Sequence, residues 1–264
     1  MVKFGLLTNP YRSIIKEVVR IASSGFDFVE IGIEEPAAPP QVLFKEKNTI
    51  LNLLKKYKVF ALAHTPYWVQ FGSSHELVRK GWIEEAKKMI NIASLLNIQL
   101  VNFHFAGRPW MKISTEIQRI SFLNNFVTSI RELVKFAKTK DVVLMLENTP
   151  SDDTQAIKDF LQVTDKVPEL RVHLDIAHAF IEGGMKKIKE YIDTFEKKIV
   201  HLHIHDNQGR SDEHLGLGMG MINFKQVVKW LKKIEYDRTI TFEVFSSDRD
   251  AVHSREFFKK IWSE

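Results

Sequence analysis

The segment His201-Leu202-His203-Ile204-His205 alternates imidazole and aliphatic side chains. Successive side chains of a β-strand point to opposite faces, so the histidines share one face and the aliphatic residues share the other. The segment Arg171-Val172-His173-Leu174-Asp175 alternates in the same way, with His173 and Asp175 on one face. In a closed barrel one face of each strand packs under helices and the other lines the interior. The two segments therefore predict barrel strands whose ionisable groups point inward.

Short runs of β-branched and aromatic residues alternate with longer amphipathic stretches along the rest of the chain. The expected strands are residues 3–8, 26–33, 59–64, 99–105, 141–147, 170–175, 198–205 and 239–245. Apolar residues at helical spacing predict a helix after each strand, at 12–24, 41–57, 75–97, 116–138, 154–164, 184–195, 222–234 and 250–262. Eight sequential strand–helix units favour a closed parallel barrel over an open doubly wound sheet. We expect residues 1–264 to form one α/β domain, a single (β/α)8 TIM barrel.

The composition excludes several kinds of site. The 264 residues suit a TIM barrel, which needs about 250 residues. No cysteine is present, so histidine, aspartate and glutamate must carry any metal chemistry. The loop Thr8-Asn9-Pro10-Tyr11 after the first expected strand lacks the glycine-rich pattern of a dinucleotide or phosphate-binding loop. We identify no signal sequence, and no apolar run approaches the roughly 18 residues that a membrane span requires. We therefore expect a cytoplasmic protein without membrane contact.

Ionisable side chains recur where six consecutive expected strands end, from the third strand to the eighth. The active site of a TIM barrel lies at this end of the strands. Imidazole and carboxylate groups that converge from several strands are what a cluster of divalent metal ions requires. The candidate metal ligands are His64, His104, Glu147, Asp175, His178, His203, Asp212, His214 and Glu243. Spacing alone leaves open which of His203 and His205 is a ligand. His173 and His201 lie one layer deeper, as expected hydrogen-bonded core residues.

Segments from the third strand to the eighth resemble the xylose isomerase-like TIM barrels, a superfamily that includes endonuclease IV, or AP endonuclease family 2. The segments that carry the resemblance are His64-Thr65-Pro66-Tyr67, His104-Phe105-Ala106-Gly107, Leu146-Glu147-Asn148-Thr149, Leu174-Asp175-Ile176-Ala177-His178-Ala179-Phe180, His203-Ile204-His205-Asp206, Asp212-Glu213-His214-Leu215-Gly216-Leu217-Gly218 and Phe242-Glu243. A suitable residue stands at every metal-ligand position of endonuclease IV. The resemblance therefore implies a metalloenzyme.

The endonuclease branch of the family implies three zinc ions. His64, His104 and Glu147 would hold the first ion. Glu147 would bridge to a second ion, whose other ligands would be Asp175, His203 and Glu243. His178, Asp212 and His214 would hold the third. Such a cluster activates a hydroxide and stabilises the leaving oxygen of a phosphodiester, so this branch implies a DNA repair hydrolase that acts at abasic sites in damaged DNA with two or three Zn²⁺ ions.

The acidic segment Glu34-Glu35-Pro36 departs from the endonuclease pattern, because it would repel a phosphate backbone. Residues 25–31 resemble the sugar isomerase and epimerase branch of the same family more closely. That branch implies one ion, Mn²⁺, Mg²⁺ or Co²⁺, held by Glu147, Asp175, His203 and Glu243. Glu147 and Glu243 would also be the catalytic residues that move the proton. His64, His104, His178 and His214 would contact sugar hydroxyls. The sequence favours the hydrolase and keeps the sugar (or sugar phosphate) isomerase or epimerase as the alternative.

Several residues near the expected barrel mouth are candidates for substrate contact. Aromatic rings suit both a sugar and an exposed nucleotide, and arginines suit a phosphate. The candidates are Tyr67, Trp68, Arg108, Trp110, His205 and Arg210, with Phe71 and Phe180 as further aromatic residues. Glu30, at the end of the second expected strand, is a candidate acid/base or ion-pair partner. The net charge of +5 selects no partner by itself, because lysines on expected exposed helix faces account for much of it.

Overall fold

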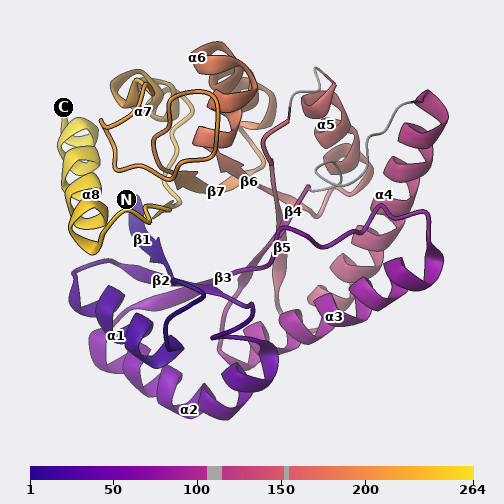
Figure 1. The fold of residues 1–264 in the computed structure, drawn as a ribbon, viewed down its shortest axis with the longest axis horizontal. Helices are drawn as coiled ribbons and strands as arrows, with labels where there is room; N and C mark the ends of the chain where they lie inside the picture. Colours follow the sequence, from indigo (N-terminus) through magenta and orange to yellow (C-terminus); the bar gives the residue numbers. More distant parts are fainter. Residues whose placement is uncertain (106–114, 152–154) are drawn as a thin grey trace.

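The computed structural model describes residues 1–105, 115–151 and 155–264. Its parallel strands close into a barrel in chain order, with the helices outside them (Figure 1). The strands are β1 (Lys3–Leu7), β2 (Phe28–Gly32), β3 (Phe60–His64), β4 (Leu100–His104), β5 (Val143–Glu147), β6 (Arg171–Asp175), β7 (Ile199–Ile204) and β8 (Thr239–Phe242). The helices are α1 (Ile14–Ser23), α2 (Pro40–Tyr57), α3 (Glu76–Leu95), α4 (Glu116–Lys138), α5 (Ala156–Lys166), α6 (Ile176–Phe195), α7 (Phe224–Lys233) and α8 (Asp248–Ser263).

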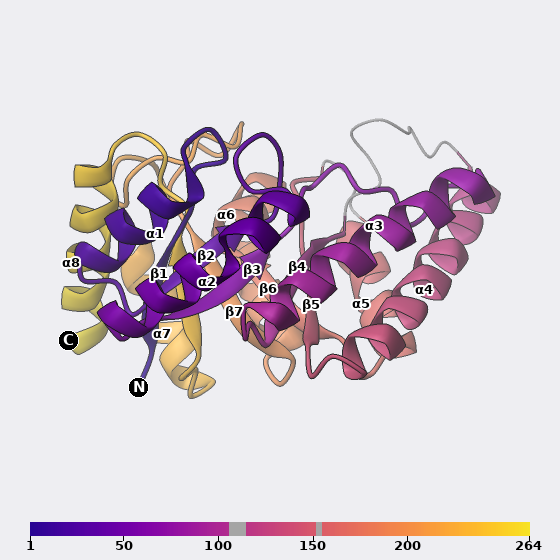
Figure 2. The ribbon, with the colours of Figure 1, turned by 90° about the horizontal axis from the view of Figure 1, so that it is seen from below.

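Pairing between the first and last strands closes the barrel. β1 and β8 pair in parallel from Lys3↔Thr239 to Leu6↔Phe242. Figure 2 shows the outer helices from the side, with α8 beside α1 and both chain ends on the same flank of the molecule. This arrangement is the (β/α)8 barrel that the sequence predicts. Among the described residues, we find no helix with the length and apolar character that crossing a membrane requires.

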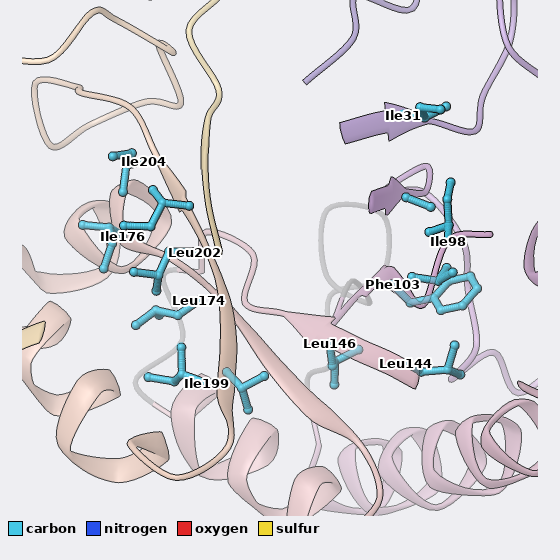
Figure 3. Close-up of a cluster of buried hydrophobic side chains, with 14 of the residues drawn as sticks. Ile31, Ile98, Phe103, Leu144, Leu146, Leu174, Ile176, Ile199, Leu202 and Ile204 are labelled. Carbon is cyan, nitrogen blue, oxygen red and sulfur yellow. The ribbon is translucent and has the colours of Figure 1, made fainter. Parts of the chain in front are cut away.

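An apolar layer lies between the strands and the helices. Leu146, Leu174 and Leu202 have no exposed surface and belong to this layer, part of which is drawn in Figure 3. Full burial of such a side chain stabilises the fold by about 1.5–3 kcal/mol. His201 and His203 on the opposite face of β7 are equally buried. The alternation of β7 therefore separates an apolar layer that stabilises the barrel from a polar interior.

The beginning of α6 is the main difference from the predicted elements. The sequence predicts a helix over 184–195, but α6 begins at Ile176, directly after β6. The Asp175 carboxylate caps this helix by accepting the His178 backbone N–H at 2.6 Å. Gly183 and Gly184 have non-helical backbone angles and interrupt the helix, which hides its first two turns from a periodicity analysis. No other expected bound is displaced by more than three residues.

Candidate metal centre

A cavity of about 680 Å³ opens at the C-terminal ends of the strands. Its wall contains seven of the nine candidate ligands, namely His64, His104, Glu147, His178, Asp212, His214 and Glu243. Asp175 and His203 are fully buried. The structure therefore brings ionisable side chains from β3 to β8, and from the loop that follows β7, to one mouth of the barrel.

Glu147 lies at the centre of the inner group. Its Oε2 is 3.0 Å from Nε2 of His104 and 3.4 Å from Nε2 of His64. Its Oε1 lies 3.8 Å from Nδ1 of His203 and 3.7 Å from Nδ1 of His178. One carboxylate thus faces imidazoles on two sides, which is the position that a bridging ligand between two ions would take. The ligand atoms of His64, His104 and Glu147 all lie within 4.8 Å of one another.

The His203 ring connects this group to a second carboxylate. Its Nδ1 lies 2.9 Å from Glu243 Oε2, and its Nε2 lies 2.9 Å from Glu30 Oε2. Histidine ligands usually donate from their second ring nitrogen to a carboxylate or a carbonyl, which fixes the ring and its tautomer. Glu30 is in the right place for that role, and Nδ1 would then face an ion shared with Glu243.

The outer group centres on Asp212. Its Oδ2 lies 3.2 Å from Nε2 of both His178 and His214. The other nitrogen of each ring faces a backbone carbonyl, at 2.8 Å for Asn148 and 3.1 Å for Glu243. Because a carbonyl can only accept, each Nδ1 carries the proton and each Nε2 can present its lone pair to an ion.

Three carboxylates of the site, those of Glu147, Glu243 and Asp212, have pKa values below their usual range. Burial raises the pKa of Glu147, but nearby His173 and His104 outweigh it and hold the pKa well below its usual range. The pKa of Glu243 falls to about 2, because His214 and His203 outweigh the effect of burial. Burial also raises the pKa of Asp212, and hydrogen bonding to His178 reverses that shift. Metal ligands must be deprotonated, so these carboxylates suit that role.

Several buried polar atoms of the site have no hydrogen-bond partner. Among the described residues these include both ring nitrogens of His64, Nδ1 of His104 and Oδ2 of Asp175. A buried polar atom without a partner costs about 1–3 kcal/mol. Divalent ions would satisfy these atoms, and imidazole with carboxylate is a donor set that zinc, manganese and cobalt accept. The residues therefore fit a metal centre.

The structure defines the contacts of three further residues near the site, which are not among the candidate ligands. Glu30 accepts from His203 and also from Nε2 of His201, at 3.1 Å. Asn102 donates to Oε2 of Glu147 at 2.6 Å, and the Asn148 side chain bonds the backbone of Asp175. Asn102 precedes His104 by two residues on β4, so strand parity alone would have placed it on the ligand face.

The candidates for substrate contact divide into three groups. Tyr67 and Trp68 line the cavity and are 51% and 38% exposed, as expected of a binding rim. His205 is fully buried and, like the exposed Arg210, is absent from the cavity lining. Arg108 and Trp110 lie outside the described residues.

The prediction that the aromatic rings of Phe71 and Phe180 are available for substrate contact is wrong. Phe71 is fully buried and Phe180 is 9% exposed, because both pack into the core instead of facing the cavity. Tyr11, Glu34 and Phe245 also line the cavity, although the sequence did not identify them as candidates for substrate contact. Tyr11 and Glu34 stand in the loops after β1 and β2, so the order of strands and loops could have identified them.

Comparison with known proteins agrees with the barrel fold. The family model described as "Xylose isomerase-like TIM barrel" matches residues 18–261. An uncharacterised protein of Methanocaldococcus jannaschii is 30% identical, with 98% of this chain and 88% of the relative covered. A probable endonuclease 4 of Aquifex aeolicus is 25% identical, with 92% of this chain and 91% of the relative covered. A crystal structure of a D-tagatose 3-epimerase-like protein has a TM-score of 0.84 at 29% identity, with 99% and 97% of the two chains covered.

Proposed function

We propose an activity for this chain, which belongs to the xylose isomerase-like TIM barrel family. It is a divalent-metal-dependent epimerase or isomerase of a small ketose or its phosphate. The observation that carries the proposal is the cavity. Its volume of about 680 Å³ lies within the roughly 300–1,000 Å³ of small-molecule sites. Two carboxylates, Glu147 and Glu243, line it beside the exposed rings of Tyr67 and Trp68.

The rim of the cavity supports a sugar more than a nucleic acid. Glu34 lines the cavity, and Glu35 beside it is exposed. Acidic side chains repel a phosphate backbone, whose neutralisation by lysine and arginine supplies most of the affinity for DNA. The resemblance to a D-tagatose 3-epimerase-like protein points the same way.

Each site residue has a role in this proposal. We assign Glu147, Asp175, His203 and Glu243 as ligands of the catalytic ion. Bound there, a divalent ion would polarise a carbonyl and make the neighbouring C–H group more acidic. One of Glu147 and Glu243 takes the proton from that carbon, and the other delivers a proton to its opposite face. The carbon is inverted without net oxidation. His64, His104 and the aromatic rim orient the hydroxyl groups.

The endonuclease interpretation remains a second candidate because of one observation. Asp212 Oδ2 lies 3.2 Å from the Nε2 atoms of both His178 and His214, and an enzyme that uses one ion does not need this trio. A third ion there would stabilise the leaving oxygen during phosphodiester hydrolysis at an abasic site. The resemblance to a probable endonuclease 4 of Aquifex aeolicus supports it.

One experiment separates the two candidates. The protein loaded with Mn²⁺, Co²⁺, Zn²⁺ or Mg²⁺ is incubated with a panel of ketoses in D₂O and, in parallel, with a duplex that carries one abasic site. Epimer formation with solvent deuterium at the inverted carbon, lost in Glu243→Gln and kept in the exposed control Glu169→Gln, is the expected result. Cleavage of the duplex without ketose turnover would establish the second candidate instead, and inactivity in both assays would refute both.

A further inference from the structure

His205 is buried in a way that packing does not explain. It directly follows β7 and has no exposed surface, and neither of its ring nitrogens has a hydrogen-bond partner among the residues that the structure describes. Its ring stacks on His214 with centroids 4.3 Å apart, which accounts for the ring position but satisfies neither nitrogen. Leaving a buried polar atom without a partner costs about 1–3 kcal/mol. Such a residue indicates a ligand that the protein atoms alone do not supply.

The atoms in front of His205 are carboxylate oxygens. Its Nε2 lies 3.4 Å from Oδ2 of Asp175 and 3.4 Å from Oδ1 of Asp212. Within the described part of the chain, Oδ2 of Asp175 also has no hydrogen-bond partner, while the other oxygen of that carboxylate caps α6. The unsatisfied nitrogen and the unsatisfied oxygen therefore face each other across a contact that is too long for a strong hydrogen bond.

Asp212 connects His205 to the outer group. One oxygen of its carboxylate faces His205, while the other faces His178 and His214 at 3.2 Å each. The ligand atoms of His205, Asp212 and His214 lie within 4.8 Å of one another. Zinc bonds of about 2.0–2.2 Å in a tetrahedron separate neighbouring ligand atoms by about 3.3–3.6 Å. Nε2 of each of the three histidines lies 3.2–3.4 Å from one of the two oxygens of Asp212, so all three can reach an ion bound at this carboxylate.

We infer that His205 is a direct ligand of an outer divalent ion that it holds together with His178, Asp212 and His214. Four protein side chains then complete a tetrahedral coordination sphere. Structural zinc sites are closed in this way, whereas catalytic sites keep a position open for water or substrate. The outer ion would tie the loop that carries Asp212 and His214 to α6 and to the end of β7. It would thus fix one wall of the cavity.

A closed outer ion also bears on the substrate, a consequence that rests on the proposed function. An ion with four protein ligands has no position for a phosphate oxygen, so it would not stabilise a leaving group in phosphodiester hydrolysis. It is compatible with epimerisation of a sugar at the inner carboxylates. His205 would then be the residue that makes the outer group structural and leaves the chemistry to Glu147 and Glu243.

Metal binding tests this inference without substrate. We would compare the wild type, His205→Asn and the exposed control His253→Asn by elemental analysis after dialysis against a graded chelator series, and by the visible absorption of the Co²⁺-loaded proteins. Tetrahedral Co²⁺ absorbs far more strongly than six-coordinate Co²⁺. In His205→Asn we expect the affinity for one ion to fall by at least about tenfold. Loss of a residue that only hydrogen-bonds to a metal ligand lowers metal affinity about 10–100-fold, and loss of a direct ligand should lower it no less. The intense tetrahedral bands should weaken with it, and the control should match the wild type.

Unchanged stoichiometry and an unchanged Co²⁺ spectrum in a folded His205→Asn protein would overturn the inference. If that variant does not fold, a Zn²⁺ titration of the ¹⁵N-histidine-labelled wild type decides instead. Nε2 of His205 should then shift on addition of the outer ion, and a resonance that stays unchanged at saturation would overturn the inference equally. These readouts are independent of ketose turnover, so failure of the proposed function and failure of the outer site would be seen separately.

Discussion

The carboxylate of Glu30 lies 2.9 Å from Nε2 of His203, inside the barrel and without exposure to solvent. Glu30 comes from β2 and His203 from β7, so the contact crosses the interior of the barrel. It directs the other ring nitrogen of His203 toward Glu243. A carboxylate behind a histidine ligand fixes its tautomer and raises its basicity. We therefore expect Glu30 to position His203 for the proposed metal centre.

Replacing Glu30 by glutamine should weaken metal binding without unfolding the barrel. Glutamine keeps the volume but removes the charge that orients His203. Loss of such an outer partner typically costs 10–100-fold in metal affinity. Competition with a chromophoric chelator measures the change, and Glu169→Gln, an exposed substitution of the same type, is the control. An affinity within twofold of the wild type would show that Glu30 does not position His203.

Replacing Glu147 by glutamine should remove metal and activity together. The carboxylate faces His64 and His104 through Oε2 and His203 through Oε1, so a neutral amide would disturb each interaction. The barrel should persist, because its stability comes from the apolar layer under the helices. Elemental analysis of the purified variant measures its metal content, and circular dichroism shows whether the barrel is folded. Unchanged metal stoichiometry would contradict the assignment of Glu147 as a ligand.

The metal-free protein should lose stability as the pH rises from about 6.5 to about 9, and His214 should contribute to that loss. Burial lowers the pKa of His214, but Glu243 and Asp212 outweigh burial and raise the pKa to about 9. A raised pKa stabilises the folded state below the unfolded value near 6.5, and this stabilisation disappears as the pH passes the folded value. The contribution is at most about 3 kcal/mol.

Urea unfolding of the chelator-treated wild type and of chelator-treated His214→Gln, each at pH 6, 7.5 and 9, measures the contribution of His214. That contribution is the difference between the two free energies of unfolding at each pH. The two free energies of unfolding should converge as the pH rises. Equal differences at all three pH values would contradict the pKa shift. With metal present the dependence should reverse, since ions compete with protons for the same nitrogens and bind more tightly at higher pH.

Affinity for duplex DNA should be weak and should respond to the acidic loop after β2. Changing Glu34 and Glu35 to lysine should strengthen binding to an abasic duplex and steepen its salt dependence, because each neutralised phosphate releases counterions. Fluorescence anisotropy at two salt concentrations measures both effects. Lysine at Glu169 and Asp237, which precede β6 and β8 and lie at the other end of the barrel, is the charge-matched control. Tight, salt-sensitive binding by the wild type would favour the endonuclease interpretation.

The fold could be predicted from the sequence because each layer of the barrel has its own periodicity. In β7 the aliphatic residues alternate with histidines, and in the structure Leu202 lies under the helices while His203 faces the interior. The start of α6 could not be predicted in this way. Its first turns depend on a cap from Asp175, and Gly184 interrupts the pattern with a positive φ of 66°.

The residues of the candidate site could be predicted from the sequence, but the contacts between them could not. Strand ends identified Glu147 and Glu243, because every strand of a parallel barrel ends at the same mouth. The partner of His203 could not be identified, since Glu30 lies 173 residues away in the chain and meets His203 only after the barrel closes. The sequence also could not distinguish Tyr67 from Phe71, because both are aromatic residues that follow β3. In the structure Tyr67 lines the cavity, whereas Phe71 is buried in the core.

The cap that Asp175 provides for α6 limits which residues this position can accept. Asparagine could still cap the helix but would bring no charge to an ion, and glutamate would carry the charge on a side chain too long for the same cap. Only aspartate meets both demands with one side chain. Changes of metal or substrate among relatives of this protein should therefore arise in the loops around the cavity, while position 175 stays the same residue.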